Sequence, residues 1–165
     1  MAKIIAERMT AAFEDEAVVF LIGMRVNRVW KLHKWLPVAL AMPRMLRELD
    51  ANPDSGFLGF HQWFGNPTIA LQYWRSFAHL ERYAKDAQRS HRSAWADFNR
   101  AVASSGDVGI WHETYRIRPG DFECIYNNMP LFGLARATAA VRAHGQRESA
   151  GGRMSAPRDV DALVP

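Results

Sequence analysis

The chain alternates between runs rich in β-branched and aromatic residues and stretches whose apolar positions follow helical spacing. The runs predict strands, because such residues fit a half-buried pleated surface. They are Val18–Asn27, Phe57–Phe64, Thr68–Arg75, Asp107–Ile117 and Phe122–Met129. Gly65-Asn66-Pro67 separates the second run from the third, which predicts a hairpin.

The stretches between these runs predict helices. Val29–Asp50 predicts a turn over 29–34 and then a helix. We expect Pro37 and Pro43 in the first turns of that helix, because proline in a helix interior removes a donor and clashes with the preceding turn. Ser76 is placed to cap a second helix and Ser90 a third.

This order of elements predicts an α+β fold. It matches the ferredoxin-like arrangement, an antiparallel sheet with helices on one face. We expect some of the aromatic residues Phe57, Phe60, Trp63, Trp111 and Tyr115 on the other face. Because a sheet with two apolar faces needs a second cover, we predict a homodimer, with another copy of the sheet as that cover.

Composition divides the chain into one domain with two flanking segments. We expect an N-terminal arm over 1–16, the α+β domain over 17–133, and a largely flexible C-terminal tail over 134–165 with a short helix near Leu134–Ala143. The tail is rich in Ala, Arg, Gly and Ser, and such a composition buries too little apolar surface to offset the entropy of ordering.

The chain has 165 residues, a mass of 18.7 kDa and a net charge of +4. That charge is too small to indicate nucleic acid as a partner. The single cysteine, Cys124, excludes an intrachain disulfide and a Cys-rich zinc site. The longest apolar runs, Ala17–Met24 and Leu36–Pro43, fall short of the roughly 18–20 residues that span a bilayer. The charged first sixteen residues do not resemble a signal peptide. We therefore expect a cytoplasmic protein with no membrane partner.

Two histidines are the first candidates for chemistry. His91 shares a predicted helical face with Trp95 and Phe98, and His112 shares a strand face with Thr114. If the helices pack on the His112 face, the two imidazoles meet across the helix–sheet gap and define a pocket. The alternative is that each histidine is a buried residue bonded to a backbone carbonyl.

Arg25 closes the first apolar strand, where an unpaired charge is costly. It either pairs with Glu113 or Glu123 or binds an anionic or oxygenated ligand. Glu113 and Glu123 lie in neighbouring predicted strands, which makes them either a general acid/base pair or ordinary surface glutamates. Tyr115 and Tyr126 either offer hydroxyl groups at a pocket edge or belong to the core or an interface.

Several long segments carry a resemblance to a known family. They are VVFLIGMRVN (18–27), KWLPVALAMPRML (34–46), QYWRSFAHLERYAKD (72–86), GIWHETY (109–115) and ECIYNNMP (123–130). They resemble the family that includes a fumagillin-pathway monooxygenase, within the antibiotic-biosynthesis-monooxygenase superfamily. The resemblance covers about Ile4 to Gly133. It implies a dimeric α+β barrel.

A narrower resemblance covers Trp74–Tyr115, which is similar to part of the haem-containing aldoxime dehydratases. It implies that His91 is the axial ligand of a haem iron, that Trp95 lies at the cofactor, and that His112 is the distal catalytic residue. Those enzymes have an additional N-terminal half that contributes pocket residues. We expect no such half here, and a dimer partner could take its place.

Three functions follow from these observations. The first is a small monooxygenase-type oxidoreductase that acts on an apolar small molecule in a barrel pocket. Its cofactor stays open, since some enzymes of the superfamily that it resembles need none. Its candidate catalytic residues are His112, Glu113, Tyr115 and Arg25. The second is a haem-binding protein or haem-dependent dehydratase with His91 as the iron ligand. The third is a non-enzymatic ligand-binding dimer.

Overall fold

A computed structural model describes residues 2–86 and 105–155. The strands are β1 (Ile5–Ala12), β2 (Ala17–Val26), β3 (Phe57–Trp63), β4 (Ile69–Trp74), β5 (Val108–Ile117), β6 (Tyr126–Met129) and β7 (Ala139–Arg142). The helices are α1 (Leu32–Asp50), α2 (Phe77–Lys85), α4 (Gly133–Ala137) and α5 (Ala150–Ser155), with 3₁₀ turns at Pro53–Ser55 and Gly145–Glu148. The third predicted helix, with His91 and Trp95, lies outside the described residues.

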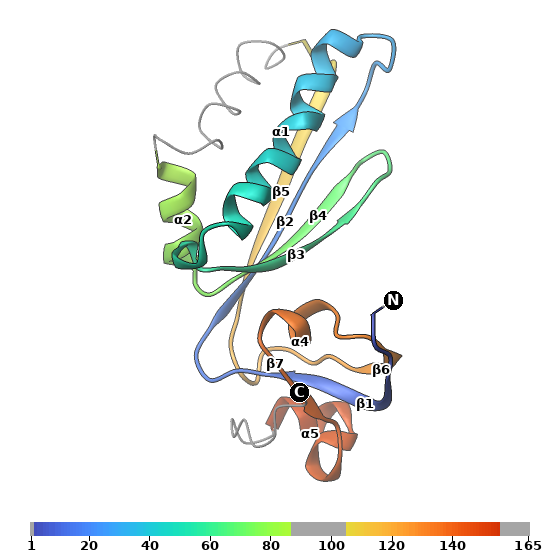
Figure 1. Cartoon of the computed structure of the whole chain (residues 1–165), viewed down its shortest axis with the longest axis vertical. Coiled ribbons are helices and arrows are strands. Elements are labelled where there is room, and N and C mark those ends of the chain that lie inside the picture. Colours follow the sequence, from blue (N-terminus) through green and yellow to red (C-terminus); the bar gives the residue numbers. More distant parts are fainter. Residues whose placement is uncertain (1, 87–104, 156–165) are drawn as a thin grey trace.

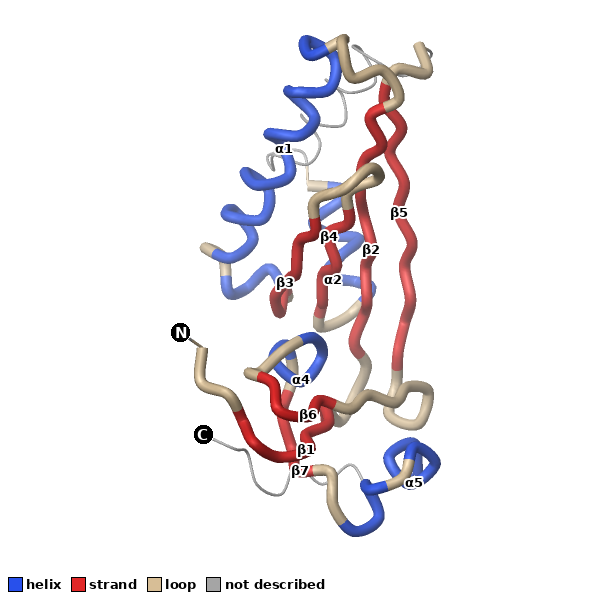
Figure 2. The backbone as a smooth tube through the Cα atoms, turned by 90° about the vertical axis from the view of Figure 1, so that its right-hand side faces the viewer, coloured by secondary structure: helices blue, strands red, loops and turns tan. Residues whose placement is uncertain are grey.

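The main sheet has four antiparallel strands in the order β3-β4-β2-β5. Figure 2 shows these strands side by side. The predicted hairpin joins β3 to β4. The side-chain oxygen and the side-chain NH₂ of Asn66, in the turn, both form hydrogen bonds with the end of β2. The Asn66 oxygen accepts from the Val26 N–H at 2.9 Å, and its amide donates to the Val26 carbonyl at 3.0 Å. The α+β class predicted from the element order is confirmed.

Both α1 and α2 cover the same face of this sheet (Figure 1). Val18 and Trp74 from the sheet are fully buried against Leu49 of α1 and Leu80 of α2. Burying each such side chain contributes about 1.5–3 kcal/mol. The prediction that the helices lie on one face is therefore confirmed.

The prolines of α1 depart from the expectation. Pro43 lies in the middle of the helix, not in its first turns. It leaves a turn without its backbone donor, yet the helix continues because Leu46 and Leu49 are buried against the sheet. The Arg47 guanidinium donates to the Pro43 carbonyl at 3.1 Å.

A second sheet, in the order β6-β1-β7, lies below the first. The fifth predicted strand is shorter than expected and belongs to this sheet. After β5 the chain turns, with the Asp121 N–H donating to the Arg118 carbonyl at 2.9 Å, and residues 122–125 carry it away from the main sheet. Tyr126 then pairs with Met9 of β1.

The two flanking segments contain more regular structure than their composition indicates. The expected arm contains β1, and the expected tail contains α4, β7 and α5 up to Ser155. Small apolar residues such as Ala140 and Val141 are buried here. Because their side chains are short, the sequence shows no clear alternation of large apolar and polar residues in this region. The division into arm, domain and tail stays a prediction.

The second sheet covers only the lower part of the main sheet's other face. Tyr73 of β4 packs there with Met9 and Leu134. Elsewhere on the same face, Trp63 and Tyr115 remain exposed. Among the described residues, no helix combines the length and apolar character that crossing a bilayer requires.

Candidate functional site

A large groove separates α1 from the main sheet, with a cavity volume of about 1510 Å³. Its lining is mainly apolar and comes from both helices and all four strands of the sheet, including Phe20, Ile22, Met24, Met42 and Leu46. Because small-molecule pockets hold roughly 300–1,000 Å³, this groove has room for a bulky apolar ligand.

His112 faces this groove from the edge strand β5. Side chains alternate along a strand, so Ile110, His112 and Thr114 share the helix-covered face and all three line the groove. The imidazole lies 5.7 Å from the ring of Phe20, centroid to centroid. In the described part of the chain, His112 is exposed and makes no hydrogen bond or ion pair. The reading of His112 as a buried residue on a carbonyl is therefore wrong.

Two other polar side chains of the groove, Gln62 and Thr68, are hydrogen-bonded to backbone. The Gln62 amide donates to the carbonyls of Trp63 at 3.2 Å and Ile69 at 3.0 Å. The Thr68 hydroxyl accepts from the Met24 N–H at 3.0 Å. The sequence pattern did not single out these two residues, although the alternation of Phe60 and Gln62 in β3 could have indicated the face of Gln62. Unlike them, His112 has free ring nitrogens for a ligand.

Three predicted site residues lie on the opposite face of the sheet. Arg25, Glu113 and Tyr115 alternate with the groove-lining residues of β2 and β5. Arg25 donates to the Asn27 side chain at 3.0 Å. Tyr115 donates to Glu113 at 2.6 Å, and this bond to the carboxylate raises the pKa of the Tyr115 hydroxyl. The structure therefore separates these residues from His112.

The predicted acid/base pair of Glu113 and Glu123 is wrong in its geometry. Glu113 lies in β5 of the main sheet, whereas Glu123 lies before β6 and accepts from Arg153 at 2.6 Å. Neither glutamate pairs with Arg25 among the described residues. The prediction failed because β5 and β6 belong to different sheets.

Tyr126 lies between the two sheets, away from the groove. Its hydroxyl accepts from the Leu134 N–H at 3.1 Å. Burial raises its pKa and raises that of the neighbouring Tyr73 to about 12. Both phenols are therefore neutral at ordinary pH, and Tyr126 has the packing role that was one of its two predicted readings.

The haem reading depends on residues that the structure does not describe. His91 and Trp95 fall in 87–104, so the predicted meeting of His91 with His112 stays a prediction. Within the described ranges, no cluster of three or more His, Cys, Asp or Glu side chains could hold a metal ion. Of the residues that the haem reading names, the structure describes His112, which faces the groove.

Comparison with known sequences places the chain in a family. The model of the family described as monooxygenase af470-like matches residues 17–134. Monooxygenase af470 from Aspergillus fumigatus is 25% identical over 154 residues, which are 87% of this chain and 54% of that protein. The chain thus spans about half the length of this curated relative.

Comparison with solved structures addresses the fold. An aldoxime dehydratase is similar with a TM-score of 0.66 at 15% identity, over 83% of this chain and 44% of that chain. A cofactor-independent oxygenase from Streptomyces nogalater has a TM-score of 0.45 at 12% identity, over 62% of this chain and 93% of that chain. At such identities the likeness concerns the fold alone. The match over 17–134 nevertheless establishes that the chain belongs to the monooxygenase af470-like family.

Proposed function

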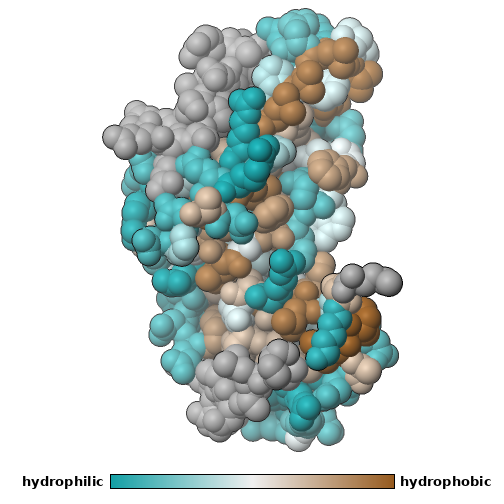
Figure 3. Space-filling view, in the orientation of Figure 1, coloured by the Kyte–Doolittle hydropathy of each residue, from teal (hydrophilic) through white to brown (hydrophobic). Residues whose placement is uncertain are grey.

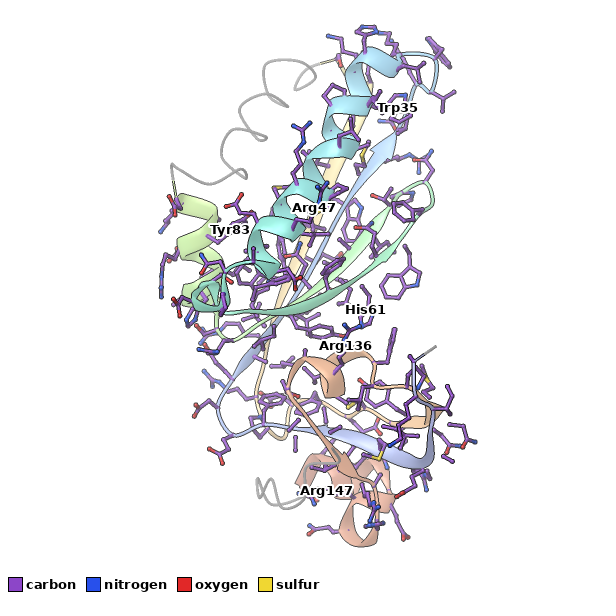
Figure 4. All side chains as sticks on the ribbon, viewed as in Figure 1. Trp35, Arg47, His61, Tyr83, Arg136 and Arg147 are labelled. Carbon is purple, nitrogen blue, oxygen red and sulfur yellow. The ribbon has the colours of Figure 1, made fainter. Side chains whose placement is uncertain are left out.

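We propose that this protein is a monooxygenase-type oxidoreductase that acts on an apolar small molecule bound between α1 and the main sheet. One observation carries the proposal: the unpaired imidazole of His112 faces an apolar groove. Family membership supports it, because the family is named for a monooxygenase. Figure 4 shows Trp35 and Arg47 near the two ends of the helix that walls this groove.

The chemistry suited to this site begins with proton removal. An unprotonated His112 accepts a proton from an acidic C–H of the substrate, such as one beside a carbonyl or in a phenol tautomer. The resulting carbanion supplies an electron pair to O₂, and the imidazolium returns the proton to give a hydroperoxide. Loss of water leaves a new carbonyl, so one oxygen atom enters the product and the other leaves as water. The apolar walls keep bulk water from the carbanion.

The substrate class follows from the lining. Met24, Met42 and Met45 all face the groove. Methionine is flexible and polarizable, so it adapts to irregular apolar shapes. With a volume of about 1510 Å³, the groove suits a bulky molecule more than a small metabolite.

A homodimer is part of the proposal. On the sheet face opposite α1, Tyr115 is 50% exposed and Trp63 is 46% exposed. Trp111 lies on the same face, and its indole nitrogen is buried without a hydrogen-bond partner in the described part of the chain. A second copy would cover these side chains. Sedimentation should give twice 18.7 kDa, and Trp111→Glu should shift the mass toward the monomer.

Oxygen consumption with a panel of enolisable and phenolic compounds tests the activity. His112→Ala should lower turnover by about 10²–10⁴-fold, the usual contribution of a general base. His144→Ala is the matched control, since His144 lies beyond β7, away from the groove. Equal turnover in both variants would refute the role of His112.

Titration with haemin tests the competing reading. A Soret shift that His91→Ala abolishes, together with no oxygen consumption by the haem-free protein, would favour the haem protein. Tight binding of apolar compounds with neither result would favour a non-enzymatic binding protein.

A further inference from the structure

The segment Arg25–Arg47, from the end of β2 through most of α1, has charged side chains of positive sign only. It contains no Asp or Glu, and its cations are Arg25, Arg28, Lys31, Lys34, Arg44 and Arg47. The whole chain has 17 acidic residues in 165, so a segment of this length would ordinarily contain about two. The first acidic residue after it is Glu48.

The same segment exposes large apolar side chains. Trp30 is 73% exposed, Val29 61% and Leu32 57%, all in the β2–α1 connection or the first turn of α1. Leu36 and Leu40 continue from Leu32 at intervals of four residues, and both are exposed. Figure 3 shows hydrophobic surface at the top of the molecule, where α1 begins.

The connection that presents these side chains is held in place. The buried carboxylate of Asp107 forms ion pairs with Lys31 at 2.9 Å and Arg28 at 3.2 Å. Its backbone carbonyl accepts from the N–H groups of Asn27 at 3.0 Å and Arg28 at 3.3 Å. Asp107 thus fixes two of the six cations of the segment, Arg28 and Lys31.

This surface also borders the groove. Leu36 and Leu40 line the groove while remaining exposed at the surface. Phe64, at the start of the β3–β4 turn, lines it too and is 88% exposed. An apolar molecule that enters at this end would therefore pass along a continuous apolar surface.

We propose that the segment Arg25–Arg47 docks on an anionic lipid bilayer, with Trp30, Val29 and Leu32 inserted among the headgroups. Basic residues beside exposed Trp and Leu are the pattern of peripheral membrane binding. A second copy of the chain fits this surface poorly, because a two-fold contact would bring its cations together. The expectation of no membrane partner rested on the lack of a spanning segment, which peripheral docking does not need.

The docking rests on charge and exposure alone. If the protein has the proposed function, docking would let a substrate dissolved in the lipid enter the groove from the membrane side. This part of the inference rests on the proposed function.

Vesicle co-sedimentation of the full chain tests the docking. Vesicles of phosphatidylcholine with phosphatidylserine should bind at least tenfold more protein than phosphatidylcholine alone, and salt should weaken binding. Trp30→Ser and the double variant Arg25→Gln/Arg44→Gln should each lower the partition coefficient about tenfold. Ile4→Ser is the matched control, because Ile4 is also 57% exposed but lies near β1. That variant should bind as the wild type does.

Three outcomes would overturn the docking: equal binding to both vesicle types, equal partition of Trp30→Ser and Ile4→Ser, or conversion of the dimer to monomer by Trp30→Ser. The last would identify the surface as a subunit interface. A water-soluble substrate assayed without vesicles separates this proposal from the enzymatic one. There Trp30→Ser should keep its turnover, whereas His112→Ala should lose turnover yet still bind vesicles.

Discussion

The imidazole of His61 in β3 accepts a hydrogen bond from the backbone N–H of Gly133 at the start of α4, with 3.0 Å between the two nitrogens. The ring also lies against Phe132, at 4.0 Å between centroids. Figure 4 shows His61 pointing from the main sheet toward α4, where Arg136 lies. This contact is a polar link between the main sheet and the second sheet's helix, and it requires a neutral imidazole.

The His61–Gly133 bond predicts a loss of stability in mild acid. Burial, with a smaller effect of the nearby Arg136 cation, lowers the pKa of His61 below its usual 6.5. The unfolded chain therefore binds the proton more readily than the folded one. Stability is fully present above pH 6.5 and is lost as the pH falls through the folded pKa. Urea unfolding at several pH values should show this decline.

His61→Gln should flatten that decline, because the glutamine amide does not titrate. The free energy of unfolding should still fall somewhat with decreasing pH, since burial also lowers the pKa of His79. The variant His79→Gln is the matched control and should remove only that remainder. An unchanged slope in His61→Gln would show that the bond to Gly133 does not depend on pH.

A second prediction concerns Gly133 itself. Its φ is +56°, and an added Cβ would lie 2.8 Å from the Tyr126 hydroxyl and 3.3 Å from that of Tyr73. Gly133→Ala should therefore destabilise the fold by about 1–3 kcal/mol, from backbone strain and from overpacking. Gly145→Ala is the control, because its φ is +58° but no atom lies within 4 Å of the added Cβ. Chemical unfolding should show the larger loss for Gly133→Ala.

A third prediction concerns the buried carboxylate of Asp107. The hydrogen bond from Lys31 is the largest cause that lowers its pKa, and Ser105 and Arg28 add to it. Its contribution to stability is therefore present above its ordinary pKa of 3.8 and is lost as the pH falls through the folded value. Asp107→Asn should lower the melting temperature at pH 7 clearly more than Glu81→Gln, which breaks an exposed pair with Lys85. Equal effects would contradict this role.

The alternation of side chains between the two faces of the long strands could be predicted from the sequence. Period-two alternation in 107–117 placed His112 and Trp111 on opposite faces, and the structure has them so. The second sheet could not be predicted from the sequence. Its strand β7 has only four residues, and the buried ones, Ala140 and Val141, have small side chains that give no clear apolar pattern. Glu123 was assigned to a strand beside Glu113, because the pattern of 122–129 does not show that the chain leaves the main sheet after β5. His61 was missed because only the fold brings β3 against residue 133, far away in the sequence.

The last prediction concerns the C-terminal residues expected to be loose. The Arg153 side chain is 7% exposed and pairs with Glu123. It also donates to the carbonyls of Arg147 at 2.9 Å and Glu148 at 2.8 Å in the preceding 3₁₀ turn. The pair with Glu123 ties α5 to the segment before β6. Because Arg153→Ala would remove three hydrogen bonds that a buried guanidinium makes, it should destabilise the fold by about 1–3 kcal/mol.

Arg142→Ala is the matched control, since its pair with Glu7 is half exposed and such pairs contribute about 0–1 kcal/mol. Urea unfolding of both variants, together with limited proteolysis after residue 145, measures the difference. Release of α5 alone, with the global transition unchanged, would show that this helix folds against the second sheet without supporting it. In that case the flexible tail predicted from composition would describe the energetics of α5, even though this helix is regular structure.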